Sequence, residues 1–117
     1  MGEIGGDNPD RSLAVVQAEH RYWLAHNFPN HTRDQLVFGM AEELGEICHH
    51  LLKRDQGIRG EGVDHESQIR DGCADLIIFM MGLADIEGFS VLAAVNEAWA
   101  EVKQRDWVKY PHDGWTK

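Results

Sequence analysis

The stretch EELGEICHH at residues 42–50 places three glutamates and two histidines within nine positions of an otherwise helix-like segment. Carboxylates and imidazoles are the side chains that most often bind metal ions or transfer protons. These residues by themselves leave three interpretations open. They are a solvated acidic face, a di-iron carboxylate site and a magnesium site that handles phosphates.

A second group of acids strengthens the metal interpretation. At 100° per residue, Glu43 and Glu46 project from one side of their helix, with Glu42 beside Glu46. Asp71 and Asp75 share one side of a later helix because they are four residues apart. If the two helices pack antiparallel, the acids converge and either take up protons or hold a cation. Oxygen ligands that remain partly open to water favour Mg²⁺, with Mn²⁺ as a substitute, over Zn²⁺.

The di-iron interpretation is the weaker one. Glu46 and His49 match an E-x-x-H motif, but a di-iron bundle needs a second such motif and further inward glutamates, which the sequence lacks. His49 falls about 60° round the helix from Glu46, on the outward side. His50 lies nearer the acidic face. Both histidines are interpreted as helix-surface residues.

Four helices are predicted to position these side chains. The first begins between residues 10 and 12 and ends before Pro29. The second begins at the capping-box pattern T-x-x-Q that starts at Thr32, and runs to about Arg54. The glycine-rich segment DQGIRGEGVD is predicted to be a loop.

The third helix is predicted over residues 66–86 and the fourth over residues 91–105, with Gly88 and Ser90 as caps between them. Short connections favour antiparallel neighbours. The predicted fold class is therefore all-α, an antiparallel four-helix bundle.

The third helix is apolar on both sides, which predicts that both of its faces are buried. One side forms a core stripe by itself, consisting of Ile69, Cys73, Leu76, Ile77, Met80, Leu83 and Ala84. Beyond the aspartates the opposite side is also apolar, with Ile78, Phe79 and Gly82. Such a second face predicts a subunit interface, so oligomerisation completes the bundle as a homodimer or a homotetramer.

Length and charge limit the classes of function. The 117 residues fit one domain, assigned to residues 11–117, after a flexible polar arm at residues 1–10. The formal charge of −9 disfavours a polymeric nucleic acid as partner, whereas a metal could bridge the acids to a small phosphate ligand. No apolar run is long enough to predict a membrane span. Cys48 and Cys73 are interpreted as reduced core thiols, which favours a cytoplasmic protein.

The motifs resemble those of a known family. EELGE at 42–46 followed by DGCAD at 71–75 is similar to the E-E-x-x-E and E-x-x-D signature of MazG-like all-α nucleotide pyrophosphohydrolases. The similarity extends to HNFPN at 26–30, LLKRDQGIRG at 51–60 and WAEVKQRDW at 99–107. It covers the chain from about residue 16 to its end and resembles a short, single-domain subtype.

The resemblance implies Mg²⁺-dependent hydrolysis of nucleoside triphosphates between the α and β phosphates, as in house-cleaning of the nucleotide pool. Glu43, Glu46 and Asp75 match the metal ligands of the family, and Glu42 is assigned to orienting a ligand or the attacking water. The family has glutamate where this chain has Gly72. Asp71, one position earlier, is expected to supply the missing carboxylate.

Substrate contacts are predicted from side chains that suit phosphates and bases. Cations for the phosphates are expected from Lys53, Arg59, Lys103 and Arg105. A base needs a flat apolar surface with a few polar groups, which Trp23, Asn27 and Trp107 could supply. Two alternatives to this function remain open. One is a phosphoribosyl-ATP pyrophosphohydrolase, and the other is a non-catalytic helical regulatory module.

Overall fold

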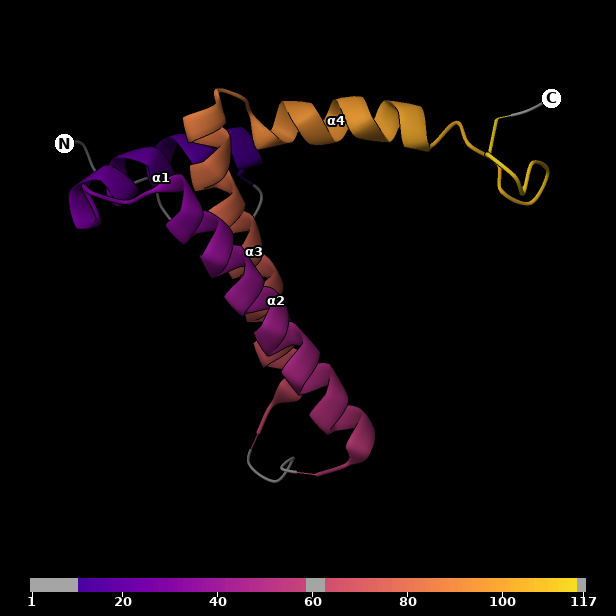
Figure 1. Ribbon diagram of the computed structural model, residues 1–117, viewed down its shortest axis with the longest axis horizontal. Coiled ribbons are helices and arrows are strands. Elements are labelled where there is room, and N and C mark those ends of the chain that lie inside the picture. Colours follow the sequence, from indigo (N-terminus) through magenta and orange to yellow (C-terminus); the bar gives the residue numbers. More distant parts are fainter. Residues whose placement is uncertain (1–10, 59–62, 116–117) are drawn as a thin grey trace.

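The structure is a computed structural model that describes residues 11–58 and 63–115. Within these residues it contains four α-helices and no strand, so the all-α prediction is confirmed. They are α1 (Leu13–Asn27), α2 (Arg33–Gln56), α3 (His65–Glu87) and α4 (Val91–Val102), shown in Figure 1. The arm predicted at residues 1–10 lies outside the described residues.

The helix boundaries follow the capping residues. Thr32 Oγ1 accepts from the Gln35 N–H at 3.2 Å while Gln35 Oε1 accepts from the Thr32 N–H at 3.1 Å, which completes the predicted capping box. Gly88 ends α3 with φ of 81°, and Ser90 caps α4. The predicted end of α4 is wrong, because the helix stops at Val102 rather than at residue 105.

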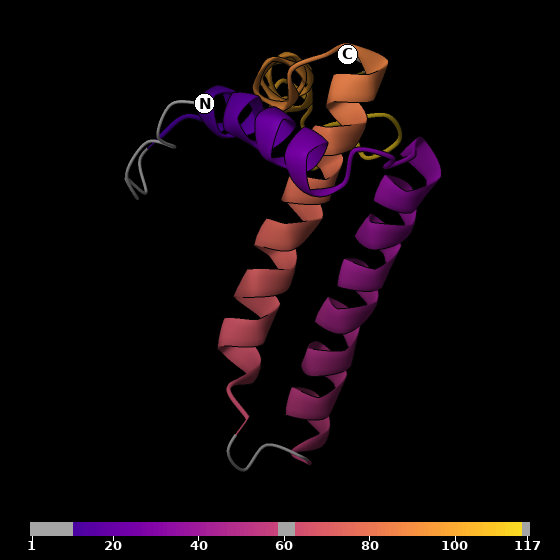
Figure 2. The same cartoon turned by 90° about the vertical axis from the view of Figure 1, so that its left-hand side faces the viewer.

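The two long helices α2 and α3 run antiparallel and form a hairpin (Figure 2). Glycines allow them to approach closely. A Cβ added to Gly72 would lie 2.8 Å from Ile47 Cγ1, and a Cβ added to Gly82 would lie 2.9 Å from Leu36 Cδ2. Larger residues at either position would push the helices apart. The hairpin is thus held at a short interaxial distance by side chains of α2 that sit over glycines of α3.

This packing overturns part of the prediction for the two faces of α3, although Ala84 of the predicted core stripe is fully buried. The side with Gly72 and Gly82, which was expected to face another subunit, packs against α2 of the same chain. Cys73 and Ile77, which were expected in the core, are exposed. Cys48 on α2 is exposed as well, so the prediction of two core thiols is wrong for the single chain.

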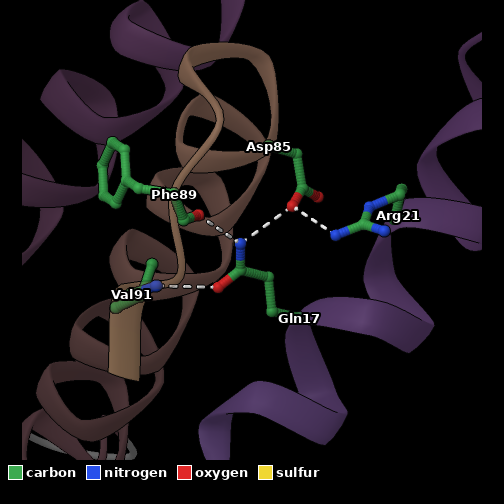
Figure 3. Close-up of polar contacts among 5 residues, drawn as sticks. All are labelled: Gln17, Arg21, Asp85, Phe89 and Val91. Atoms are coloured by element: carbon green, nitrogen blue, oxygen red, sulfur yellow. Dashed lines mark hydrogen bonds and ion pairs between the residues drawn. The ribbon is translucent and has the colours of Figure 1, made fainter. Parts of the chain in front are cut away.

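The buried core lies at the other end of the molecule, where α1 crosses α3 (Figure 1). Met81, Ala84 and Val91 are almost fully buried there, and residues of α1 pack against them. Buried Gln17 of α1 joins the elements: its Nε2 donates to Asp85 Oδ1 and to the Phe89 carbonyl, and its Oε1 accepts from the Val91 N–H at 2.9 Å (Figure 3). We call these contacts the Gln17 latch.

The latch holds the turn between α3 and α4, and the two helices meet at a bend of 99°. The expectation that a short connection makes them antiparallel is therefore wrong. Helix α4 contacts α1 and α3 but, within the described residues, not α2. One chain thus contributes a hairpin and two crossing helices rather than a closed bundle. No single described helix is long and apolar enough to cross a membrane, and α3 and α4 reach that length and composition only when taken together across their bend.

The chain is extended and exposes an unusually large surface. Its radius of gyration is 18.0 Å, whereas a compact domain of this length has about 13 Å. The accessible surface is 8916 Å², which exceeds by roughly 2,400 Å² the surface of a folded monomer of this mass. Many large apolar side chains contribute to the excess, among them Leu44, Leu52 and Trp99.

Candidate functional site

A cavity of about 610 Å³ opens between α1 and α2, over α3. Its lining combines aromatic and apolar side chains with a few polar groups and two acids. The lining residues are His20, Trp23, Leu24, Phe28, His31, Gln35, Leu36, Glu43, Asp75, Ile78 and Phe79. We call this space the aromatic cavity. A concave apolar pocket with few polar groups is typical of small-molecule sites.

Two of the predicted metal ligands, Glu43 of α2 and Asp75 of α3, line the cavity together. The antiparallel hairpin brings them together because α2 and α3 pack side by side at this level. The pKa of Glu43 is raised by desolvation, and further by the negative charges of Asp75, Glu42 and Glu46. The acids are thus close enough to repel one another, as the sequence predicts.

The remaining predicted acids stand outside the cavity. Glu42, Glu46 and Asp71 are exposed and do not belong to its lining. Among the described residues no three metal-binding side chains lie close enough together to form a finished metal site. This arrangement still fits Mg²⁺, which is usually held by one or two carboxylates, waters and the phosphates of a substrate. Glu43 and Asp75 supply that minimal pair of oxygen ligands.

Gly72 lies at a close contact between α2 and α3. A Cβ there would meet Ile47 Cγ1 at 2.8 Å and the backbone oxygen of Glu43 at 3.7 Å. A glutamate side chain at this position would therefore have to displace α2. The glycine at residue 72 is thus compatible with the close packing of the hairpin.

One wall of the cavity is an aromatic group around Trp23. The His20 ring stacks on Trp23 with centroids 5.8 Å apart, and Phe28 meets Trp23 edge-on at 6.0 Å. The pKa of His20 is lowered, mainly by desolvation and also by the charge of His31, against an opposing effect of Asp85. His20 is therefore a neutral aromatic ring at pH 7.

Asn27 lies outside the aromatic cavity. Its Nδ2 donates to the Trp23 carbonyl at 2.9 Å, and its side chain lines a smaller neighbouring cavity of about 280 Å³. The two cavities share Phe28, His31 and Gln35. Asn27 thus supports the backbone under Trp23, whereas its predicted contact with a base stays a prediction.

The two histidines of EELGEICHH, His49 and His50, differ in exposure and in their contacts. His49 is exposed, as predicted. His50 is half-buried, with its Nδ1 2.9 Å from Nδ1 of buried His65 and its Nε2 4.0 Å from a carboxylate oxygen of Glu46. One of the two Nδ1 atoms must carry the hydrogen that joins the rings. His50 thus connects the acidic side of α2 to the first residue of α3.

The predicted phosphate-binding cations do not surround the cavity. Lys53 donates to Gln56 Oε1 on its own helix at 3.2 Å. Lys103, Arg105 and Trp107 follow α4, which leaves the hairpin near the top of the molecule in Figure 1 and does not contact α2. Arg59 lies outside the described residues. None of the described members of this group lines the aromatic cavity.

Several lining residues are not among those that the sequence predicts. His20, Phe28, His31 and Gln35 come from α1, the turn after it and the start of α2. The segment HNFPN at 26–30 supplies the turn that carries Phe28. The clustering of aromatic residues between 20 and 31 was the only available signal for this wall.

Comparisons of the chain with family models, with curated proteins and with solved structures found no match in any of the three. The chain is thus described by its own fold and cavity alone. It is an all-α chain with an aromatic cavity that is lined by two carboxylates.

Proposed function

We propose that this chain is a Mg²⁺-dependent nucleoside triphosphate pyrophosphohydrolase. One observation carries the proposal: the aromatic cavity is lined at once by stacked rings and by Glu43 and Asp75. A nucleotide has the same two parts, a flat base that stacks on aromatic rings and a phosphate chain that binds a metal ion.

The base is assigned to the rings of His20, Trp23 and Phe28. Trp23 holds the central position, with a ring contact on either side. Gln35 and His31 provide the polar groups that can read the edge of the base. The volume of about 610 Å³ lies within the range of ligand sites, roughly 300–1,000 Å³.

The phosphates are assigned to the acidic end of the cavity. When Mg²⁺ is bound, it polarises the phosphoryl oxygens and neutralises the charge that builds on the leaving pyrophosphate. Glu43 and Asp75 would hold the ion, and Glu46 and Asp71, which lie outside the cavity on the same two helices, would be further ligands. Glu42 would orient a water, whose oxygen would bond to the α phosphorus as the bond from that phosphorus to the bridging oxygen breaks. The bridging oxygen would leave with pyrophosphate, and the proton of the water would pass to the solvent.

The raised pKa of Glu43 supports the same assignment. Carboxylates that repel one another favour the protonated form, and a divalent cation removes this repulsion. The binding of a cation should therefore be coupled to the release of a proton from the acids. Such coupling is the behaviour expected of a metal site.

The direct test is pyrophosphate release from the common ribo- and deoxyribonucleoside triphosphates in the presence of Mg²⁺. We expect turnover of at least one of them, and a loss on the order of 10²–10³ in kcat for Glu46→Gln, as for removal of one electrostatic contact to a transition state. Glu101→Gln, in an exposed glutamate on α4, is the matched control and should keep the wild-type rate. Absence of turnover on every triphosphate would overturn the proposal.

A second variant tests the base subsite. Trp23→Ala removes the central ring and should raise KM by about tenfold, since stacking of a base is worth about 1–3 kcal/mol. His49→Ala, at an exposed position on the outward side of α2, should leave KM unchanged. Equal KM values for the two variants would show that the base does not bind to these rings.

A further inference from the structure

Two histidines join α2 to α3 near the end of the hairpin where one helix leads into the other. Nδ1 of His50 on α2 lies 2.9 Å from Nδ1 of His65, the first residue of α3. The ring centroids are 5.2 Å apart, which is close to the largest separation that this N–N distance allows. Each ring therefore points its Nδ1 straight at the other, as a hydrogen bond between the rings requires.

Glu46 lies one turn before His50 on α2 and faces the other nitrogen of its ring. A carboxylate oxygen of Glu46 is 4.0 Å from His50 Nε2. This is the distance of an ion pair rather than of a hydrogen bond, and the negative charge attracts a ring N–H across it. Glu46 thus favours the tautomer of His50 that carries its proton on Nε2. Because a neutral imidazole has one N–H, His50 Nδ1 is then a bare acceptor, and the hydrogen between the rings belongs to His65.

The surroundings of His65 select the same tautomers independently. His65 is only 8% exposed, and its Nε2 is buried with no hydrogen-bond partner among the described residues. If His65 carried its proton on Nε2, a buried N–H would be left without an acceptor, which is rare in folded proteins. With the proton on Nδ1, only a lone pair is left unpaired, which proteins tolerate more readily. Both ends of the pair therefore indicate Nε2–H on His50 and Nδ1–H on His65.

This chain of contacts gives an exposed glutamate a fixed neighbour. The Glu46 side chain is 61% exposed, whereas that of His50 is 13% exposed. An exposed glutamate samples many rotamers and loses that freedom when it binds a metal ion. The His50 ring is held by a residue of the neighbouring helix, so its Nε2–H points in one direction. A fixed donor beside a carboxylate limits the positions that the carboxylate can take, which favours metal binding.

We propose that His50 is a positioning residue for Glu46, which it orients through Nε2–H while the Nδ1–H of His65 holds the His50 ring in place. The second oxygen of Glu46 would remain available to the metal ion. The role of Glu46 as a metal ligand rests on the proposed function, whereas the tautomers of the two rings follow from the contacts alone.

The tautomers are tested on the metal-free wild type by nitrogen NMR of the histidine side chains. At about pH 8, above the ordinary pKa of histidine, the chemical shifts of the two ring nitrogens report which of them carries the proton. We expect the proton on Nε2 of His50 and on Nδ1 of His65, with a scalar coupling between the two Nδ1 nuclei across the hydrogen bond. The opposite tautomers, or two rings without this coupling, would overturn the proposal.

The positioning of Glu46 is tested by metal affinity, so that no turnover is needed. The probe is Mn²⁺ alone, whose free concentration is measured by electron paramagnetic resonance. His50→Leu keeps an apolar side chain of similar size but has no donor, and it should bind Mn²⁺ about tenfold more weakly, as for loss of a group that orients a metal ligand. His50→Gln keeps an N–H near the position of Nε2 and should retain most of the wild-type affinity. If His50 only supported the fold, the two variants would bind Mn²⁺ alike, because neither restores the bond to His65.

The part played by His65 is tested in the same titration. His65→Leu removes the donor to His50 and should weaken Mn²⁺ binding in the same direction as His50→Leu. His65→Asn keeps an amide N–H near the position of Nδ1 and should recover affinity. Equal affinities of these two variants would show that His50 is oriented without His65. Circular dichroism shows whether each variant is folded, and the NMR test of the wild type depends on none of them.

His49→Leu is the matched control. The His49 ring meets that of His50 edge-on, with centroids 5.1 Å apart, but takes no part in the chain from Glu46 to His65. Its affinity for Mn²⁺ should equal that of the wild type. Equal affinities of wild type and His50→Leu would refute the positioning role and leave the proposed function standing. A wild type that binds no Mn²⁺ would instead refute the proposed metal site, and with it the positioning of a metal ligand.

Discussion

Glu43 is partly desolvated and lies near the negative charges of Asp75, Glu42 and Glu46. Desolvation and the neighbouring acids raise its pKa in the folded protein, so the folded chain binds a proton more readily than the unfolded chain does. The stability that this proton provides is complete below the unfolded pKa and is lost as the pH rises through the raised folded pKa. In the absence of metal, this contribution of Glu43 to stability should therefore decrease as the pH rises from about 4 towards 7.

The substitution Glu43→Gln should remove this loss. One pKa unit corresponds to about 1.4 kcal/mol, and solvent screening at a partly exposed site leaves only a fraction of that, so we expect Tm at pH 7 in EDTA to rise by about 1–2 °C. The same variant should lose the stabilisation that Mg²⁺ gives the wild type. Glu97→Gln serves as control. A lower Tm of Glu43→Gln in EDTA would show that Glu43 stabilises the fold instead.

Gly72 is predicted to be required for packing rather than for flexibility. Gly72→Ala adds a Cβ that meets Ile47, and the variant should lose about 1–3 kcal/mol of unfolding free energy. Gly45, also inside a helix, has no atom within 4 Å of an added Cβ. Gly45→Ala should therefore gain about 0.5–1 kcal/mol from helix propensity. Urea denaturation of both variants measures the difference, and equal effects would contradict the close approach at Gly72.

The acids could be predicted from sequence because their spacing along a helix fixes the side from which they project. Glu43 and Asp75 indeed line one cavity. The aromatic wall was visible in the sequence only as a cluster of rings between residues 20 and 31, because its position beside Glu43 and Asp75 depends on the crossing of α1 over α3. No periodicity within a single helix records such a crossing.

At the scale of the element, the Gln17 latch is predicted to set the direction of α4. Gln17→Ala leaves the Val91 N–H, the Phe89 carbonyl and Asp85 without this partner. An unpaired buried polar group costs about 1–3 kcal/mol, so a loss of at least 2 kcal/mol in unfolding free energy is expected. Gln104→Ala removes only an exposed bond to the Ala100 carbonyl and should cost less than about 0.5 kcal/mol. Similar losses for both would show that the latch contributes little.

The beginnings of the helices were predictable, whereas their mutual directions were not. Capping residues such as Thr32 and Ser90 act on their own backbone within three residues, so their effect is visible in the sequence. The bend between α3 and α4 depends on Gln17, which is 68 residues from Asp85. A buried glutamine in an amphipathic helix gives no local indication of the partner it will find.

The packing of the two faces of α3 could not be predicted from the sequence either. Both sides of this helix are apolar, and the sequence could not decide which of them packs within the chain. The glycines decide, because only the side with Gly72 and Gly82 allows α2 to approach closely. The side with Cys73 and Ile77 is exposed.

At the scale of the whole molecule, the open surface predicts that stability depends on protein concentration. If a second copy covers α4 and the α2–α3 hairpin, unfolding also separates the copies, so a higher concentration favours the folded assembly. A tenfold increase changes the free energy by about 1.4 kcal/mol, which should raise Tm by about 3–5 °C for two chains of this length. Trp99→Lys should show a lower Tm with no such dependence, because Trp99 is one of the exposed apolar side chains that the second copy would cover. Scanning calorimetry over two decades of concentration measures both.

A wild-type Tm that does not change with concentration would mean that one chain is stable with its hairpin face in water. The excess of roughly 2,400 Å² in exposed surface would then have to be explained without a second copy.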